Sequence, residues 1–172
     1  MVSPLGSITN FYATPVTKLE FLLAKQLPYV GIALVEFASL VAVAVLVFSV
    51  PVKGSALALV GGALVYAMAS TSLGLLVSTF VRTQIAAIIG ASIIAVMPAV
   101  QFSGWFTPVS SMTGSAWLMG LAFPSTYFQH ISLGTFTKAL DFPSLVLDFA
   151  ALAGFVSIFL LSSLILLDKQ ER

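Results

Sequence analysis

The stretch SALALVGGALVYAMASTSLGLLVSTFV, residues 55–81, contains no charged residue. A helix of about 20 apolar residues crosses the hydrocarbon core of a bilayer, so this stretch is long enough to span it. Three further runs have a similar length and are almost free of charge: 28–50, 85–107 and 145–167. We therefore predict an all-α membrane protein in which one domain, residues 1–172, carries four transmembrane helices.

The composition of the whole chain supports this class. Of its 172 residues, 59% are hydrophobic and 8% are charged, whereas soluble domains are about a quarter charged. The net charge of +1 provides no strong field for nucleic acid, so we predict no nucleic-acid partner. The chain has no cysteine and one histidine, His130, which excludes thiolate and histidine metal clusters. It also lacks the phosphate-binding GxxxxGK loop and the HExxH motif, so we predict neither an enzyme nor a cofactor.

Basic residues are distributed unevenly around the four predicted spans. With the N-terminus in the cytoplasm, the inner face holds five of them and the outer face two, Lys53 and Lys138. A fifth crossing by residues 115–137 would change this ratio to four against three. Because basic residues concentrate on the cytoplasmic side, we predict four spans with both termini in the cytoplasm.

Two segments then lie outside the spans. Residues 1–27 form a cytoplasmic segment ahead of the first span. Residues 108–143 contain several Pro and Gly and many Ser and Thr, which makes them too polar for a lipid-facing helix. We expect a re-entrant or short-helix segment at the outer face, with Ser125 as the N-cap of its second helix.

Small residues recur every four positions on two of the spans. They are Ser70, Gly74 and Ser78 on the second span, and Ala87, Ala91, Ala95 and Ala99 on the third. Small residues let membrane helices approach closely, so these stripes predict helix–helix contacts. The contacts are either within this chain or at a seam with another subunit.

A capped helix is predicted just before the first span. Thr17 and Glu20 form a capping box, and Val16 with Phe21 forms the matching hydrophobic staple. The helix carries leucines on one side and lysines on the other, namely Leu19, Leu23, Leu27, Lys18 and Lys25. It serves either as an interfacial anchor facing lipid headgroups or as a docking site for a partner.

Glu36 lies inside the first predicted span, about 10 Å beyond Pro28 at 1.5 Å per residue. A carboxylate at this depth is costly and is by default a candidate functional residue. It either lines a path through the protein or is a protonated or snorkelling group with a structural hydrogen bond.

Two motifs resemble those of ABC-2 type transporter permeases. GSITNFYATPVTKLEFLLAKQLPY, residues 6–29, is similar to the family's link between its second and third spans. Thr14-Pro15 and Lys25 match that pattern, while Ala24 stands where glycine is usual. Residues 101–136 resemble the end of the family's fifth span at Phe102, Ser103, Gly104, Pro108, Met112, Trp117, Pro124 and Tyr127. The C-terminal LLDKQER also fits the family's usual ending.

The resemblance covers nearly the whole chain and is strongest to multidrug-exporter-like permeases and the membrane half of the ribosome-associated ATPase. It implies an exporter subunit of the bacterial inner membrane, driven by a separate ABC ATPase subunit and paired with a second permease copy or homologous half. The four spans would correspond to spans three to six of that family, so we expect a C-terminal portion, a split gene product or a remnant.

The resemblance also implies roles for particular residues. The implied ATPase-coupling surface comprises Thr14, Pro15, Thr17, Lys18, Glu20 and Lys25. The possible translocation path or gate comprises Glu36, Gln101, Phe102, Ser103 and Gly104.

Two other classes of function stay open. A secondary transporter without an ATPase needs a relay of intramembrane charges or inverted repeats, and only Glu36 is available. A non-transporting remnant or assembly subunit would need only the small-residue stripes, to pack against other membrane proteins and lipid.

Overall fold

The computed structural model describes residues 17–80, 83–104, 106 and 108–170. The prediction of an all-α protein is confirmed, because these residues form helices and connecting turns and no strand. The helices are α2 (Lys18–Leu46), α3 (Ala56–Ser78), α4 (Gln84–Phe102), α5 (Ser115–Leu121), α6 (Pro124–Thr137) and α7 (Val146–Gln170). Two 3₁₀ turns, η2 (Val109–Ser111) and η3 (Phe142–Leu145), precede α5 and α7.

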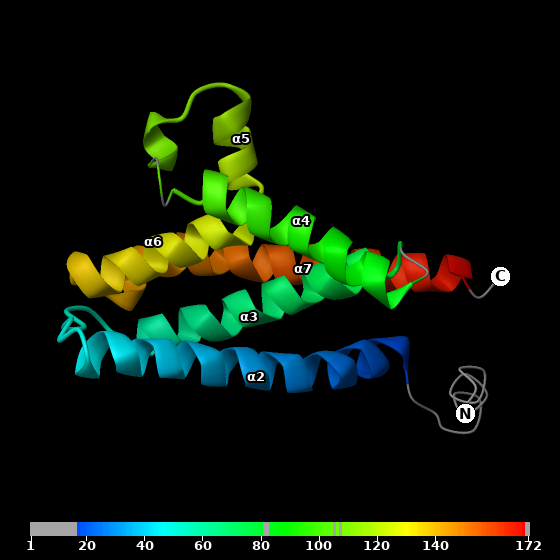
Figure 1. Ribbon diagram of the computed structural model, residues 1–172, viewed down its shortest axis with the longest axis horizontal. Helices are drawn as coiled ribbons and strands as arrows, with labels where there is room; N and C mark the ends of the chain where they lie inside the picture. The colour runs from blue at the N-terminus through cyan, green and yellow to red at the C-terminus, as the bar shows by residue number, and fades with distance from the viewer. Residues whose placement is uncertain (1–16, 81–82, 105, 107, 171–172) are drawn as a thin grey trace.

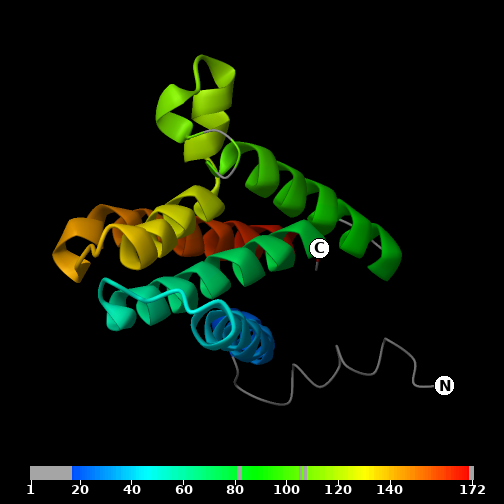
Figure 2. The same ribbon diagram turned by 60° about the vertical axis from the view of Figure 1, so that its left-hand side comes forward.

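The helix α3 lies at the centre of the bundle (Figures 1 and 2). On one side it packs against α2, and on the other against α6 and α7. The helix α4 crosses the bundle obliquely, and α5 projects away from it (Figure 1). The first turn of α2 and the last turns of α7 lie at the same end of the bundle.

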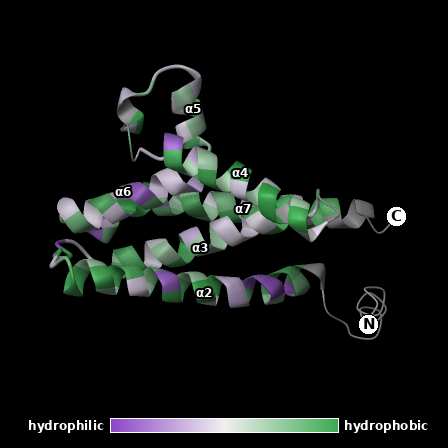
Figure 3. Ribbon diagram, viewed as in Figure 1, coloured by the Kyte–Doolittle hydropathy of each residue, from purple (hydrophilic) through white to green (hydrophobic). Residues whose placement is uncertain are grey.

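Three helical stretches are long and apolar enough to cross a membrane: Leu19–Leu46, Ala56–Ser78 and Phe142–Leu166. Apolar residues predominate along these helices, and short hydrophilic stretches interrupt them on α2 (Figure 3). A fourth apolar stretch, Ile88–Phe102 in α4, is shorter. The predicted span 85–107 ends early because Gly104, two residues after Phe102, adopts a φ of 97°, a conformation that terminates helices.

The buried core lies where α3, α6 and α7 meet. It contains Ala58, Ile131, Leu145 and Leu152, all with no exposed surface. Gly62 of α3 allows α6 to approach, because a Cβ at this position would lie 2.9 Å from Cγ2 of Ile131. Hydrocarbon gives helices no hydrophobic drive to associate, so close packing of this kind stabilises the bundle.

The starts of α3 and α4 have ordinary side-chain caps, whereas α6 begins at a different residue from the one predicted. The hydroxyls of Ser55 and Thr83 accept hydrogen bonds from amides in the first turns of α3 and α4. The prediction of Ser125 as the N-cap of α6 is wrong. Pro124 occupies the first helical position, where its missing N–H is not needed, and Phe123 is therefore the cap.

The small-residue stripe on α3 is not packed within the described part of this chain. A Cβ added at Gly74 would meet no atom within 4 Å, and Ser78 is exposed. The buried face of α3 is a different one, formed by Ala58, Leu59, Gly62, Ala63, Ala67, Ala69, Ser72 and Val77. On α4, Ala91, Ala95 and Ala99 are half-buried, and the side chain of Ala87 lies outside the described residues.

Candidate functional site

The start of α2 has the capping box that the sequence predicts. The amide of Thr17 donates to Oε2 of Glu20 at 2.8 Å, and the amide of Glu20 donates to Oγ1 of Thr17 at 3.3 Å. The hydrogen bond from the Thr17 backbone, together with the one from its side chain, lowers the pKa of Glu20. Thr14, Pro15 and Val16 lie outside the described residues, as does the side chain of Lys18.

Lys25 lies two turns further along α2, where its side chain is exposed. Its Nζ sits 4.4 Å from the centre of the Phe21 ring, a cation–π contact one turn apart on the same helix. The predicted coupling residues that the structure describes, Thr17, Glu20 and Lys25, therefore share the first two turns of α2.

Gln26 is the residue that sequence reasoning missed. Only 2% of its surface is exposed. Its Nε2 donates to the carbonyl of Met68 at 2.7 Å, to Oγ1 of Thr71 at 2.8 Å and to Oγ of Ser72 at 2.9 Å. Two hydrogens are thus shared among three acceptors on α3. The side chain fixes α2 to α3 about two turns above the capped end.

The buried face of α2 differs from the leucine face that the sequence suggests. Leu22, Gln26 and Val30, spaced four apart, are buried, whereas Leu19 and Leu27 are 45% and 70% exposed. In a membrane the outward face is apolar, and polar side chains turn inward. An isolated amide in an apolar helix was the signal that could have identified Gln26.

The predicted gate residues lie at the end of α4, beside a groove. The groove has a volume of about 480 Å³. Its polar and aromatic lining comes from α3, α6 and the end of α4, and comprises Tyr66, Ser103, Ser125, Phe128, Gln129 and Ser132. We call it the α4–α6 groove. Of the predicted residues, Ser103 is buried and lines it, whereas Gln101 is exposed and does not.

Gln129 lies beside the turn that follows α4. A Cβ on Gly104 would lie 3.5 Å from Oε1 of Gln129. This oxygen and Oγ of Ser125 are buried and have no hydrogen-bond partner among the described residues. Tyr66 and Phe128 stack at 4.6 Å between ring centroids and form an aromatic wall. The groove therefore combines uncharged hydrogen-bonding groups with an aromatic surface.

Glu36 does not line this groove. Its side chain is exposed on α2, and its backbone carbonyl accepts a hydrogen bond from Oγ of Ser39 at 2.7 Å. The neighbouring residue Phe37 does contact the groove wall, because its ring lies 6.0 Å from that of Phe128. The structure thus separates Glu36 from the other predicted gate residues.

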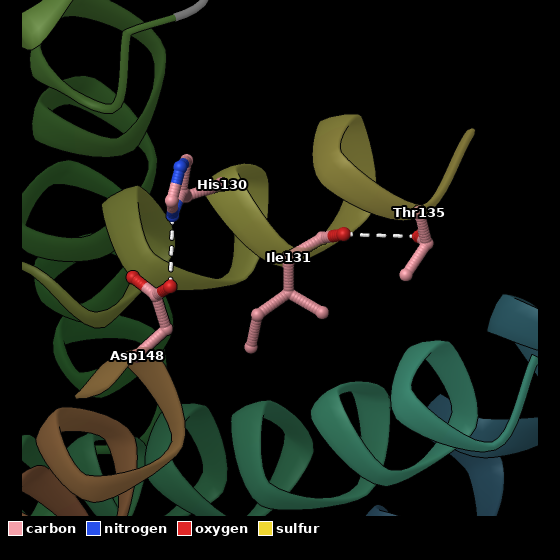
Figure 4. Close-up of polar contacts among 4 residues, drawn as sticks. All are labelled: His130, Ile131, Thr135 and Asp148. Atoms are coloured by element: carbon pink, nitrogen blue, oxygen red, sulfur yellow. Dashed lines mark hydrogen bonds and ion pairs between the residues drawn. The ribbon is translucent and has the colours of Figure 1, made fainter. Parts of the chain in front are cut away.

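His130 and Asp148 form a side-chain pair that the sequence did not indicate. Nδ1 of His130 lies 2.8 Å from Oδ2 of Asp148 and links α6 to the first turn of α7 (Figure 4). The His130 side chain is 53% exposed and that of Asp148 13%. One turn further along α6, Oγ1 of Thr135 donates to the carbonyl of Ile131 at 2.9 Å.

A family model described as ABC-2 type transporter matches residues 2–137 of the chain. The chain belongs to the ABC-2 type transporter family. Two curated relatives of this chain come from Escherichia coli. The probable multidrug ABC transporter permease YbhS is 28% identical over 123 residues, which cover 72% of this chain and 33% of the relative. The probable multidrug ABC transporter permease YbhR is 26% identical over 135 residues, which cover 77% and 36%.

The chain spans about one third of the length of these relatives. No solved structure gives a significant match. The region matched to the ABC-2 type transporter family ends at the last residue of α6. It contains both groups of predicted residues, the capped start of α2 and the end of α4. Because it belongs to this family and has several helices long and apolar enough to cross a membrane, the chain is a multi-pass membrane protein.

Proposed function

We propose that the chain is the membrane-spanning subunit of an ATP-binding-cassette exporter in the bacterial inner membrane. ATP would be bound and hydrolysed by a separate ATPase subunit, and a second permease copy or homologous half would complete a dimer. Membership of the ABC-2 type transporter family and the permease names of the relatives support this proposal.

The observation that carries the proposal is the continuity of α2. One helix of 29 residues runs from the Thr17 cap through the first predicted span. Gln26 fixes this helix to the central helix α3 with hydrogen bonds of 2.7 to 2.9 Å. An ATPase that moves residues 6–14 and the first turn of α2 would therefore act on α3 through Gln26. We propose that the coupling surface comprises Thr14, Pro15, Thr17, Lys18, Glu20 and Lys25.

The proposed gate lies at the other group of residues, Gln101 to Gly104. Ser103 and the α4–α6 groove offer hydrogen-bonding groups beside an aromatic wall, a lining suited to an uncharged or amphipathic part of a substrate. Exposed isoleucines on α4, Ile85, Ile88 and Ile93 among them, offer an apolar face to a second copy. Glu36 would join the path where that copy or further helices cover the exposed face of α2.

Co-purification with the ATPase subunit tests the proposal. Replacing residues 6–14 with a Gly/Ser linker is expected to abolish binding of the ATPase, because the docking segment is removed. The matched control replaces residues 111–114, part of the connection between α4 and α5, with the same kind of linker. That variant is expected to keep the ATPase. Equal recovery of the ATPase with both variants would contradict the proposed coupling surface.

Glu36→Gln tests the carboxylate separately. Transport by the assembled exporter should change with pH in the parent and lose that dependence in the variant. Identical transport by parent and variant at every pH would remove Glu36 from the path.

A further inference from the structure

Glu36 is an exposed carboxylate on a membrane-spanning helix. It lies within the stretch Leu19–Leu46, which is long and apolar enough to cross a membrane. The described residues offer its carboxylate no hydrogen bond or ion pair, and only its backbone carbonyl has a side-chain partner. At 1.5 Å per residue the two ends of α2 are about 15 Å and 27 Å away, farther than a glutamate side chain reaches. Such a group in contact with hydrocarbon is costly, and intramembrane carboxylates almost always face protein or a water-filled cavity.

Glu36 belongs to a face of α2 that the described part of the chain leaves uncovered. Lys25, Tyr29, Ile32 and Glu36 follow one another at intervals of four, three and four residues, so they lie on one side of the helix. All four side chains are exposed. The side of α2 that packs against α3 is a different one and contains Gln26. We call the uncovered side, defined by these four residues, the Glu36 face.

A groove of about 460 Å³ lies beside the Glu36 face, between α2 and α3 and toward the capped end of α2. Lys25 and Tyr29 of the Glu36 face line it on one side, and Thr71, Gly74 and Ser78 are among its lining residues on α3. A Cβ added at Gly74 would meet no atom within 4 Å. Because small residues let membrane helices approach closely, this groove can seat a helix that also passes along the Glu36 face.

The charge of Glu36 identifies the chemistry of the missing neighbour. A lipid tail offers no hydrogen-bond donor, whereas a basic side chain complements a carboxylate within the membrane. A second copy of this chain in the same orientation has no basic residue at that depth, because all seven lie outside the four predicted spans. Hydroxyls near the middle of its helices are engaged, since those of Ser92 and Ser157 donate to carbonyls of their own helices.

We propose that a transmembrane helix from outside these 172 residues covers the Glu36 face and places a basic side chain against the Glu36 carboxylate. Closer to the capped end of α2, the same helix packs into the groove beside Gly74. The matched regions make up about one third of the curated relatives, so proteins of this family carry further sequence that can supply such a helix. The inference rests on the membrane placement of α2 and requires neither an ATPase nor a substrate.

Photo-crosslinking in the membranes of cells that produce the chain tests this proposal. Benzoylphenylalanine replaces Ile32 on the Glu36 face or, as the matched control, Ile158 on α7, whose exposed fraction of 58% equals the 57% of Ile32 within one percentage point. Mass spectrometry of the adducts at position 32 should identify an apolar peptide that contains Lys or Arg and is absent from this sequence. Position 158 should give lipid adducts. Lipid adducts alone at position 32, a peptide of this chain, or the same peptide from both positions would overturn the proposal.

Two pairs of variants separate the charge from the packing. Glu36→Gln keeps the size of the side chain and removes its charge, so the crosslink at position 32 should fall about tenfold, equivalent to about 1.4 kcal/mol of binding, whereas Glu36→Asp should retain it. Gly74→Leu fills the groove and should also weaken the crosslink. Gly154→Leu on α7 is its control, because a Cβ at either glycine meets no atom within 4 Å. An unchanged crosslink in both Glu36→Gln and Gly74→Leu would refute the proposed contact.

A synthetic helix tests the charge complementarity on the purified chain in lipid vesicles. The probe is a leucine-rich peptide of about 24 residues, long enough to cross the bilayer, with a single Lys or a Leu at its centre. Energy transfer to a fluorophore on Phe48→Cys, at an exposed position just after α2, reports binding. The parent should bind the Lys peptide about tenfold more tightly than the Leu peptide, equivalent to about 1.4 kcal/mol, and Glu36→Gln should lose this preference. Equal binding of the two peptides by the parent would contradict the assignment of a basic partner.

Discussion

The substitution Gly62→Ala tests whether the contact between α3 and α6 holds the bundle together. The added methyl would lie 2.9 Å from Cγ2 and 3.2 Å from Cδ1 of Ile131. Carbon atoms in favourable contact are about 3.5 to 4.0 Å apart, so Ile131 must move by roughly 0.5 to 1 Å. Ile131 has no exposed surface and packs against Ala58, Leu145 and Leu152, which leaves it no free space.

Overpacking of this kind costs about 1 to 3 kcal/mol. Replacing a helical glycine with alanine also gains up to about 1 kcal/mol of helix propensity. Gly74→Ala on the same helix has the propensity gain without the overlap, since nothing lies within 4 Å of its Cβ. The propensity gain cancels between the two variants, so the overlap at Gly62 should make Gly62→Ala less stable than Gly74→Ala by about 1 to 3 kcal/mol.

Because the sequence contains no cysteine, a single introduced thiol can be labelled specifically. Thr135→Cys places one thiol at a fully buried position of α6 in both backgrounds. A thiol-reactive fluorophore then reports the temperature at which α6 separates from α3. About 2 to 4 °C per kcal/mol is expected for a chain of this size. Equal midpoints in the two variants would refute the reasoning.

A double-mutant cycle supplies an independent check. Ile131→Ala removes the atoms that the new methyl meets and leaves a cavity. The double variant of Gly62→Ala with Ile131→Ala should therefore be less destabilised than the sum of the single variants. Additive effects would mean that the two positions do not meet as the structure describes.

Three further substitutions test other contacts. Thr17→Ala removes the cap of α2 and should destabilise its first turn by about 1 kcal/mol, seen as faster amide exchange there. Glu20→Gln, whose amide oxygen still accepts, is the control, and exchange as slow in Thr17→Ala as in the parent would contradict the role of the cap. Because the pKa of Glu20 is lowered, its stabilising effect should be complete above the ordinary carboxyl pKa and lost as the pH falls through the lowered value. Gln26→Leu keeps the volume of the side chain and loses its hydrogen bonds, which average about 0.6 kcal/mol each between membrane helices. Spin labels on α2 and α3 should show a broader distribution of distances between the two helices. An unchanged distribution would argue that the hydrogen bonds of Gln26 do not fix α2 to α3. His130→Ala breaks a pair in which the His130 side chain is 53% exposed and that of Asp148 is 13% exposed, and it should lower stability by less than about 1 kcal/mol. A larger fall in the thermal midpoint would show that the pair with Asp148 matters more than its exposure suggests.

The features of the fold that rest on local chemistry were predictable from the sequence. The charge-free run of residues 55–81 predicted α3, and the spacing of Thr17 and Glu20 predicted the cap of α2. The start of α6 was misplaced because Pro124 itself takes the first helical position. At the two helix starts the deciding atoms lie within one turn of helix, whereas for α3 the signal is the length of the run itself.

Contacts between helices were not predictable in the same way. The sequence pattern places the leucines of α2 on one side of the helix but does not say which side is buried, and lipid lets Leu27 face outward and draws Gln26 inward. His130 and Asp148 are 18 residues apart on different helices, and no local pattern indicates that they meet. Of the predicted gate residues, Ser103 lines the α4–α6 groove and Glu36 does not, because they belong to helices whose packing one sequence leaves open.

The position of Gln26 along α2 divides this helix into two unequal arms. About 12 Å separates residue 26 from the first residue of the helix, and about 30 Å separates it from Leu46, at 1.5 Å per residue. If residue 26 is the pivot and α2 moves as one piece through Pro28, a displacement at its capped end is magnified about 2.5-fold at the far end. A displacement of about 1 Å on one side of the bilayer thus becomes a displacement of about 2.5 Å on the other side.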